Sequence, residues 1–389
     1  MRGFFNFMLM YKYLLASFCF LLLSCSSTTN PIELIIKKRE PQLKPIYKNK
    51  ENHNLQILYT KVVRDSLGMP SFIQYDYQAD NNVYFYPAST MKLPIVALTL
   101  QKINELRNTG INITVESKIL LLSADQITTE TTFKDLISKV FLVSDNSASN
   151  ILINFLGYNY FNQQMREKGL NTIVLNHKFN PDPYVKTDWK IYTLDRDLIS
   201  KDETQEIIEH NNLDNLLQGK FQILNGEKVA TPFNFKTKNK ASLRDLDGVM
   251  KRIIYPDLFQ EQDRINLSDQ DYNFLRYWMS RFTFEDIGIE YQKDSQYFDS
   301  YNKFFIYGDS TNTIDRKIRI YNKVGVAYGA LTDISYIRDY QKNIEFFLSA
   351  TIYVNQNQIV NDNIYEYDDV GIPFLAELAR QVYKLEEQY

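Results

Sequence analysis

Residues 88–94 read Ala-Ser-Thr-Met-Lys-Leu-Pro, and an apolar run, Ile-Val-Ala-Leu-Thr-Leu, follows at residues 95–100. Apolar residues continue at helical spacing to Arg107, where Asn-Thr-Gly stops the helix. Ser89 is therefore expected near a helix N-terminus, with Lys92 on the same face of the first turn. A serine hydroxyl becomes a nucleophile when a base takes its proton, and a desolvated lysine amine can be that base. This stretch is the proposed centre of chemistry.

Composition narrows the function classes. The chain has 389 residues, is 44% hydrophobic and 23% charged, and carries a formal net charge of -3, so it can bury a large core and nucleic-acid binding is not expected. Its three histidines, His53, His177 and His210, have no metal-ligand spacing, and we expect neither a metal nor a cofactor. The sequence also lacks a Gly-x-Ser-x-Gly motif and a phosphate-binding glycine loop.

The N-terminus is typical of an export signal. Positive charge at Arg2 and Lys12 precedes an apolar run at residues 13–23, which is too short for an ordinary spanning helix. The sequence Leu-Leu-Ser-Cys ending at Cys25 resembles the lipobox of bacterial lipoproteins, which implies cleavage before Cys25 and lipidation of its sulfur. An ordinary signal or an uncleaved anchor is the alternative. Cys19 is the other cysteine, so the mature chain has no intramolecular disulfide.

We expect an exported protein, lipid-anchored to a bacterial membrane, with its domain in the periplasm or outside the cell. Residues 1–24 would be the signal peptide and residues 25–54 a polar, proline-containing tether. Residues 55–389 would form the functional domain, and a monomer is expected.

Hydrophobic periodicity predicts an α+β fold, with strands at both ends of the chain and helices between them. An antiparallel sheet flanked by N- and C-terminal helices would pack beside an all-helical lobe, with the active site in the cleft between. The expected strands are residues 55–63, 72–77, 304–307, 318–326, 331–340 and 344–354. The expected helices are residues 132–143, 146–156, 160–168, 242–254, 268–282 and 373–387, besides the one that follows Ser89. Residues 113–122 remain unassigned, and residues 176–240 suggest loops around short helices.

Two further motifs follow the first. Ser-Asp-Asn occupies residues 144–146 between two expected helices, and Lys-Val-Gly occupies residues 323–325 on an expected strand. Ser-x-x-Lys, Ser-Asp-Asn and Lys-Thr-Gly, in this order, are the signatures of class A β-lactamases and penicillin-binding proteins. The chain therefore resembles the serine β-lactamase-like hydrolases, nearest to class A, over roughly residues 55–389. Each motif alone has a structural explanation, as a helix cap, a capping turn or a strand edge.

The resemblance implies a role for each residue. Ser89 would attack a carbonyl carbon and become acylated, with Lys92 as base or proton relay. Ser144 would pass a proton to the leaving nitrogen, and Asn146 would bind the substrate amide. Lys323 would place positive charge near the substrate carboxylate.

The same resemblance places substrate-binding backbone at Gly325 and Val326. The N–H groups of Ser89 and Val326 would form the oxyanion hole, where one donor is worth about 3 kcal/mol.

Two departures from class A concern the substrate and the second half of the reaction. Val324 stands where a hydroxyl normally helps to hold the substrate carboxylate. The class A glutamate that activates the deacylating water has no counterpart in residues 175–184, where Asp182 is the one carboxylate and His177 is a possible substitute.

Three functions follow from these observations. The leading one is an exported serine acyl hydrolase that cleaves β-lactams through a Ser89 acyl-enzyme. The second is a penicillin-binding D,D-peptidase, or another serine hydrolase with slow deacylation, acting on a peptidoglycan-like substrate. The third is a non-catalytic binding lipoprotein on the same scaffold.

Overall fold

The computed structural model describes residues 30–38, 40–122, 128–179, 189–200, 209–285, 294, 296–312 and 314–388. The predicted signal peptide and Cys25 lie outside these residues, as does Asp182. Within the described ranges, no helix has the length and apolar character needed to cross a membrane.

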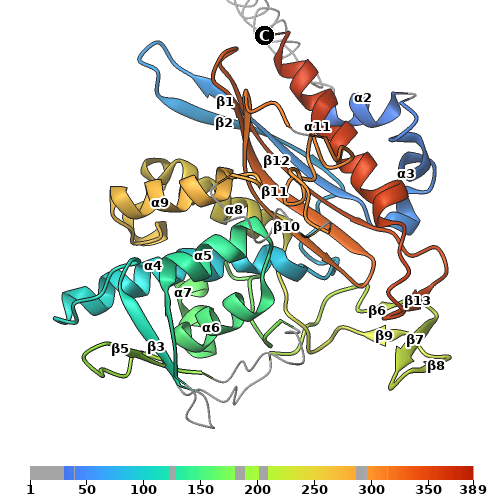
Figure 1. The fold of residues 1–389 in the computed structure, drawn as a ribbon. Helices are drawn as coiled ribbons and strands as arrows, with labels where there is room; N and C mark the ends of the chain where they lie inside the picture. The colour runs from blue at the N-terminus through green and yellow to red at the C-terminus, as the bar shows by residue number, and fades with distance from the viewer. Residues whose placement is uncertain are drawn as a thin grey trace, which may run out of the picture.

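A five-stranded antiparallel sheet runs through the molecule in the order β10-β11-β12-β1-β2 (Figure 1). Its strands are β1 (Gln56–Arg64), β2 (Pro70–Tyr77), β10 (Ile318–Ala327), β11 (Ala330–Asp339) and β12 (Ile344–Tyr353). The N-terminal hairpin joins the C-terminal strands through β1, where Ile57 lies opposite Ala350. Strand β10, which carries Lys323, is therefore an edge strand.

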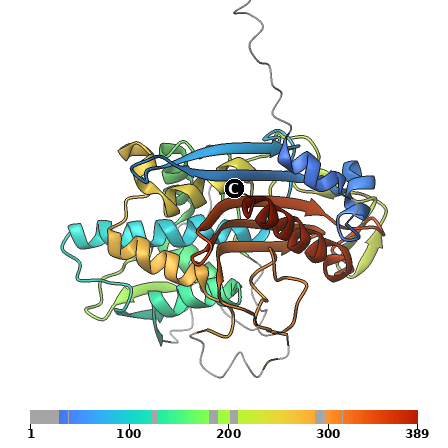
Figure 2. The same ribbon diagram turned by 90° about the horizontal axis from the view of Figure 1, so that it is seen from above.

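Both faces of the sheet are covered, and β11 and β12 are buried along almost their whole length, whereas β2 is largely exposed. On one face, Tyr59 and Phe346 pack with the helices α2 (Pro31–Lys37), α3 (Lys44–Lys48) and α11 (Ile372–Glu386). On the other face, Leu58 and Phe347 join the core of the helical lobe. Figure 2 shows α2 and α11 side by side over the first face.

The tether prediction is wrong for residues 30–54. Asn30 caps α2, Pro31 and Pro45 occupy the first turns of α2 and α3, and a 3₁₀ turn follows at Lys50–His53. These two short helices bury a set of apolar residues against the sheet: Ile32, Ile35, Ile36, Leu43 and Ile46. The prolines start helices here rather than mark an unstructured linker.

The helical lobe is built around α4 (Lys92–Asn108), the helix that follows Ser89. Its residues from Lys92 to Ile103 are all buried, as expected for a helix surrounded on every side. The other helices are α5 (Phe133–Leu142), α6 (Asn146–Leu156), α7 (Tyr158–Glu167), α8 (Leu243–Ile254) and α9 (Asp269–Ser280), with short turns at Pro256–Leu258, Glu261–Asp263 and Tyr367–Gly371. The predicted α+β fold is confirmed.

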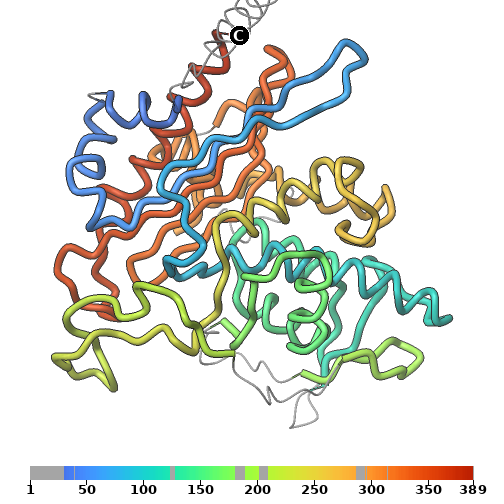
Figure 3. Tube along the Cα trace, turned by 180° about the vertical axis from the view of Figure 1, so that it is seen from behind, coloured from blue at the N-terminus to red at the C-terminus, as the bar shows by residue number. Residues whose placement is uncertain are grey.

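In the described parts of residues 176–240 the structure has short strands, where loops around short helices were expected. A small sheet joins β3 (Lys118–Leu122), β4 (Thr128–Thr132) and β5 (Lys190–Thr193). The accessory strands, as we call the second group, are β6 (Leu217–Gln218), β7 (Phe221–Leu224), β8 (Glu227–Val229), β9 (Phe233–Asn234) and β13 (Ile359–Val360). Strand β13 pairs with β7 in parallel, so Figure 3 shows the yellow-green accessory strands beside the red loop that carries β13.

The strand predicted at residues 304–307 is also wrong, because this segment is a series of turns. The N–H of Phe305 donates to the Asp333 carboxylate, and the Phe305 side chain is buried in the core beneath α11. The backbone N–H of Phe305 therefore bonds to a side-chain carboxylate, where a strand residue would bond to the backbone of a neighbouring strand.

Candidate active site

Ser89 lies in a 3₁₀ turn, Ala88–Met91, that leads directly into α4. The Thr90 backbone N–H and hydroxyl both donate to the carbonyl of Pro87, at 3.1 and 2.5 Å. Ala88 has a φ of 45°, a left-handed conformation that costs an alanine about 1–2 kcal/mol. Strain of this kind concentrates at functional sites. The surrounding structure thus holds the residue before Ser89 in an unfavourable conformation.

Lys92 is fully buried, and its amine faces the Ser-Asp-Asn turn. It donates to Asn146 Oδ1 at 2.7 Å and to the carbonyl of Ser144, and lies 3.3 Å from Ser144 Oγ. A neutral amine has two protons and one lone pair. When its protons bind Asn146 and the Ser144 carbonyl, the lone pair is left to accept a proton.

The Ser-Asp-Asn turn has two roles: Asp145 caps a helix, and Ser144 and Asn146 contact Lys92. Asp145 caps α6 by accepting a hydrogen bond from the Ala148 N–H at 2.6 Å. Ser144 has a φ of 56°, a second left-handed residue at the site. The cap fixes the turn so that Ser144 and Asn146 both reach Lys92.

Lys323 completes the cluster from the edge strand β10. Its amine donates to Ser144 Oγ at 2.9 Å and to the carbonyl of Val324 at 2.9 Å. Gly325 explains how β10 comes so close: a Cβ there would lie 2.6 Å from the Pro87 carbonyl oxygen and 2.9 Å from the Thr90 nitrogen. The structure therefore gives Gly325 a positioning role beside the nucleophile turn.

Burial lowers the pKa of both amines, and the neighbouring charges then act on each in a different way. Burial, followed by the charge of Lys323, holds the pKa of Lys92 well below 10.5, and Asp145 only partly opposes this. Burial lowers the pKa of Lys323 to about 7, against the charge of Asp333. Both amines therefore lose a proton more easily than a lysine in water does.

A buried polar network holds β10 in place from behind. Lys303 donates to Asn322 Oδ1 at 2.6 Å, and the Asn322 amide donates to Asp333 Oδ1 at 2.9 Å. Asn302 donates to the carbonyl of Phe141, at the end of the helix that precedes Ser144. The strand and the turn are thereby tied to one another.

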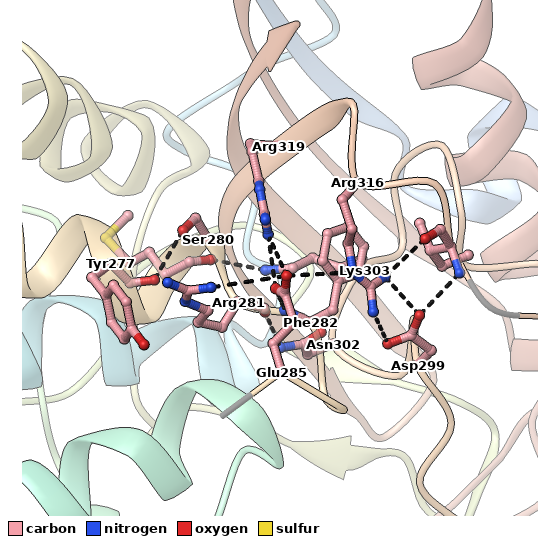
Figure 4. A network of polar contacts seen from close by, with 12 residues as sticks. Tyr277, Ser280, Arg281, Phe282, Glu285, Asp299, Asn302, Lys303, Arg316 and Arg319 are labelled. Atoms are coloured by element: carbon pink, nitrogen blue, oxygen red, sulfur yellow. Dashed lines mark hydrogen bonds and ion pairs between the residues drawn. The ribbon is translucent and has the colours of Figure 1, made fainter. Parts of the chain in front are cut away.

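Figure 4 shows how this network continues to the surface. Arg319 of β10 makes two hydrogen bonds to Glu285, at 2.9 and 2.8 Å, and Arg316 pairs with Asp299 at 2.6 and 2.7 Å. These ion pairs fasten the segment carrying Lys303 to the strand that carries Lys323.

Ser89 stands between two cavities that share Ser89, Asn146, Val326 and Tyr367 in their walls. The first, of about 360 Å³, extends past Phe179 and Tyr328; the second, of about 340 Å³, extends past Ser144, Val324 and Tyr301. An acyl-transfer substrate has an acyl part and a leaving group on opposite sides of the reacting carbon. Since Ser144 lines the second cavity, we name the two the acyl cavity and the leaving-group cavity.

Phe179 takes the place above Lys92 where a deacylating carboxylate would be useful. Its backbone N–H and carbonyl are bonded to the Asn150 amide, at 2.9 and 2.8 Å, and the Lys92 amine lies 4.7 Å from the centre of its ring. Among the described residues, the nearby acidic group that acts on Lys92 is Asp145, which is occupied as a helix cap.

His177 does not replace the missing carboxylate. Its Nδ1 lies 2.7 Å from the carbonyl of Lys178, and its Nε2 accepts from the backbone N–H of Asn239 at 3.3 Å. With both ring nitrogens engaged by backbone, the side chain fixes the loop and has no lone pair free for water.

Ser89, at the start of α4, thus lies beside two buried lysines and the Ser-Asp-Asn turn. A profile described as the Beta-lactamase enzyme family matches residues 73–385, and the chain belongs to this family. A comparison with curated proteins gives no match.

Solved structures with the same fold include PBP-A, with a TM-score of 0.53 at 18% identity, covering 93% of this chain and 97% of that one. A mutant of PBP-A, solved as an acyl-enzyme complex with penicillin G, aligns with a TM-score of 0.54 at 18% identity over 93% and 98% of the two chains. A β-lactamase from Sphaerobacter thermophilus aligns with a TM-score of 0.51 at 12% identity over 92% and 97%.

The predicted residues do meet in space. Lys92, Ser144, Asn146 and Lys323 are in direct contact, while Ser89 and Val326 line both cavities. The sequence analysis missed other wall residues of the acyl cavity, namely Phe179, Lys238, Tyr328 and Tyr367. No local motif marks them, because they come from loops that only the fold brings together.

Proposed function

We propose that this protein is a penicillin-reactive serine enzyme that forms an acyl-enzyme at Ser89 and releases it slowly. Its natural substrate would be a peptidoglycan-like D-alanyl peptide, and a β-lactam would acylate the same serine. Lys92 would take the Ser89 proton, Ser144 would pass it to the leaving group, and Lys323 would attract a carboxylate.

The Phe179 ring over the Lys92 amine carries this proposal. Acylation needs the neutral amine, which burial supplies. Deacylation needs a base that activates water, and an aromatic ring at 4.7 Å excludes water from that side of the amine instead. The first half of the reaction is therefore equipped, whereas among the described residues no acidic group other than the capping Asp145 acts on Lys92 to serve the second half.

Intact-mass spectrometry of the purified protein with benzylpenicillin tests the proposal. We expect the mass to increase by one penicillin within minutes and the adduct to persist after free drug is removed. Rapid return to the unmodified mass with product accumulation would instead establish the β-lactam hydrolysis that the family match favours.

Phe179→Glu sharpens this test, since it places a carboxylate where the ring now stands. The acyl-enzyme lifetime should shorten by about 10²-fold, the lower range for a positioned general base. Phe221→Glu, a change on β7 outside both cavities, is the matched control and should leave the lifetime unchanged. Equal lifetimes in wild type and Phe179→Glu would show that this ring does not limit deacylation.

We also propose export and lipid anchoring through Cys25, supported by the leader and by the extracytoplasmic substrate class. Cys25→Ser should move the protein from the membrane fraction to the soluble exported fraction, and it should abolish incorporation of labelled palmitate. Membrane retention without lipid would identify an uncleaved anchor.

A further inference from the structure

The acyl cavity continues beyond the catalytic cluster to a lysine that the mechanism does not use. Lys238 lines its wall together with Tyr86, Tyr328 and two asparagines, Asn361 and Asn363. Lys238 comes from the segment after β9, and the asparagines follow β13. The segments that follow the accessory strands β9 and β13 thus supply this part of the wall of the acyl cavity, far along the chain from Ser89.

The charge in this cavity has one sign. Lys238 is half-buried, with its amine 5.6 Å from the centre of the Phe233 ring, and within the described part of the chain it makes no ion pair. No acidic side chain among the described residues lines the acyl cavity. His177, the other titratable base there, has its pKa lowered by burial and, to a lesser degree, by the charge of Lys238. Lys238 is therefore the cation that a bound molecule would meet.

Two tyrosine hydroxyls in the same wall add hydrogen-bond donors for an anionic group. The phenol oxygen of Tyr365 accepts the Asn361 N–H at 2.7 Å, and that of Tyr367 accepts the Gly329 N–H at 2.7 Å. Because each oxygen already accepts, its own O–H proton remains available to donate. The leaving-group cavity, by contrast, contains the carboxylate of Asp368 in its wall.

The wall is held rigidly. Phe233 of β9 stacks on Tyr328 with ring centres 5.1 Å apart, and Phe235 packs against Tyr86 at 5.7 Å. Tyr328 immediately follows β10, the strand that carries Val326. The accessory strands are thus fixed to the strand that binds the reacting carbonyl.

We propose that Lys238 is a specificity-determining residue that selects substrates whose acyl part carries a carboxylate, such as a peptide with an acidic side chain. This inference rests on the proposed function, because it requires acyl transfer at Ser89. In that step the Ser89 Oγ–carbon bond forms, the bond to the leaving group breaks, and the serine proton passes through Lys92 and Ser144 to the leaving group.

Matched thioesters test the selection. N-glutaryl-D-alanyl and N-pentanoyl-D-alanyl thioglycolate share the leaving thiol and the chain length of the acyl group, and only the first has a carboxylate at its end. Thiol release in the first turnover measures the acylation rate constant. We expect wild type to react about tenfold faster with the glutaryl compound, the size of a charge-assisted contact.

Variants at Lys238 then assign the preference. Lys238→Met should reduce the ratio of the glutaryl rate to the pentanoyl rate to unity, Lys238→Glu should reverse that preference, and Lys238→Arg should keep it. Lys236→Met removes an exposed lysine from the same segment, outside the cavity, and should behave as wild type.

Two outcomes overturn the inference alone: no preference in wild type, or a preference that survives Lys238→Met. Failure of both thioesters while benzylpenicillin still acylates Ser89 also overturns it. Failure of all three compounds overturns the proposed function.

Discussion

The half of the site that we propose to handle protons is buried and closed, whereas the half that we propose to face the substrate is open and aromatic. Lys92 and Lys323, in the first half, are 0% and 2% exposed and bond directly to the Ser-Asp-Asn turn. Val326, in the second half, is 37% exposed and faces both cavities. Deprotonating a serine at neutral pH requires desolvated amines in one fixed geometry, which leaves little room for variation.

The substrate-facing half departs from class A in several places. The Phe179 ring covers Lys92, Val324 stands where the resemblance to class A would put a hydroxyl, and Lys238 lies in the wall of the acyl cavity. Such changes alter what binds and how long it stays without disturbing the nucleophile. The comparison predicts that variants in the first half change the rate for every substrate, whereas variants in the second half discriminate between substrates.

The largest effect is expected from Ser89→Ala, which removes the nucleophile. Acylation by benzylpenicillin should fall by at least about 10⁴-fold, and no adduct should appear in intact-mass spectra. Ser66→Ala, in the exposed turn between β1 and β2, is the control and should be acylated as wild type is. An adduct on the Ser89→Ala protein would show that another residue is the nucleophile, and the division of the site into these two halves would then be wrong.

Lys92→Met should come next, with acylation slowed by about 10²–10⁴-fold for charged and neutral substrates alike, because the base is lost. Lys102→Met is a matched control on the same helix. Lys102 is also buried, but it bonds the carbonyls of Phe155 and Leu156, far from the reaction. It should lower the melting temperature, at a cost of about 1–3 kcal/mol, and keep the acylation rate of the folded protein.

If both lysine variants lose acylation to the same degree after correction for folded fraction, Lys92 has only a structural role. A measured melting temperature for each variant makes that correction possible.

The pH dependence of acylation separates the two amines. The rate should rise with pH as Lys92 loses its proton, which happens well below pH 10.5. For a substrate with a carboxylate on the leaving group, the rate should fall again as Lys323, with a pKa of about 7, loses its charge. Each limb should approach a tenfold change per pH unit.

The rate for benzylpenicillin should therefore fall above about pH 7, as Lys323 loses its charge. The methyl ester of N-pentanoyl-D-alanyl thioglycolate has no carboxylate for Lys323 to hold, and it should show only the rising limb. Identical falling limbs for both compounds would mean that Lys323 acts on the proton relay rather than on the substrate.

Much of the proton-handling half could be predicted from the sequence, because its residues lie in short motifs at helix starts and on a strand. Ser89 with Lys92, and Ser144 with Asn146, are neighbours along the chain, so local spacing already places them together. Their convergence with Lys323 followed only from the order of the motifs. The five strands of the sheet and the main helices were visible for a similar reason, since periodicity is a local property.

The rest depends on contacts between distant segments. Phe179 covers Lys92 because Asn150 holds its backbone, and no pattern near Phe179 indicates this. The accessory strands are two to four residues long and need β13, far along the chain, to pair with β7. Residues 30–54 looked polar because their isoleucines are sparse, yet those few residues are the ones the sheet buries. In each case the structure is determined by a contact with a distant segment, which the local sequence pattern does not show.

Val324→Thr should have the smallest effect and gives the finest test of the substrate-facing half. Val324 is 6% exposed and lines the leaving-group cavity, so a hydroxyl of nearly the same volume would face a bound leaving group there. A charge-assisted hydrogen bond should speed acylation by benzylpenicillin about three- to tenfold. The neutral methyl ester offers no carboxylate, so its rate should not change. An equal gain for both compounds would trace the effect to a moved strand rather than to the hydroxyl, because a shift of β10 would carry the Val326 N–H with it and affect every substrate.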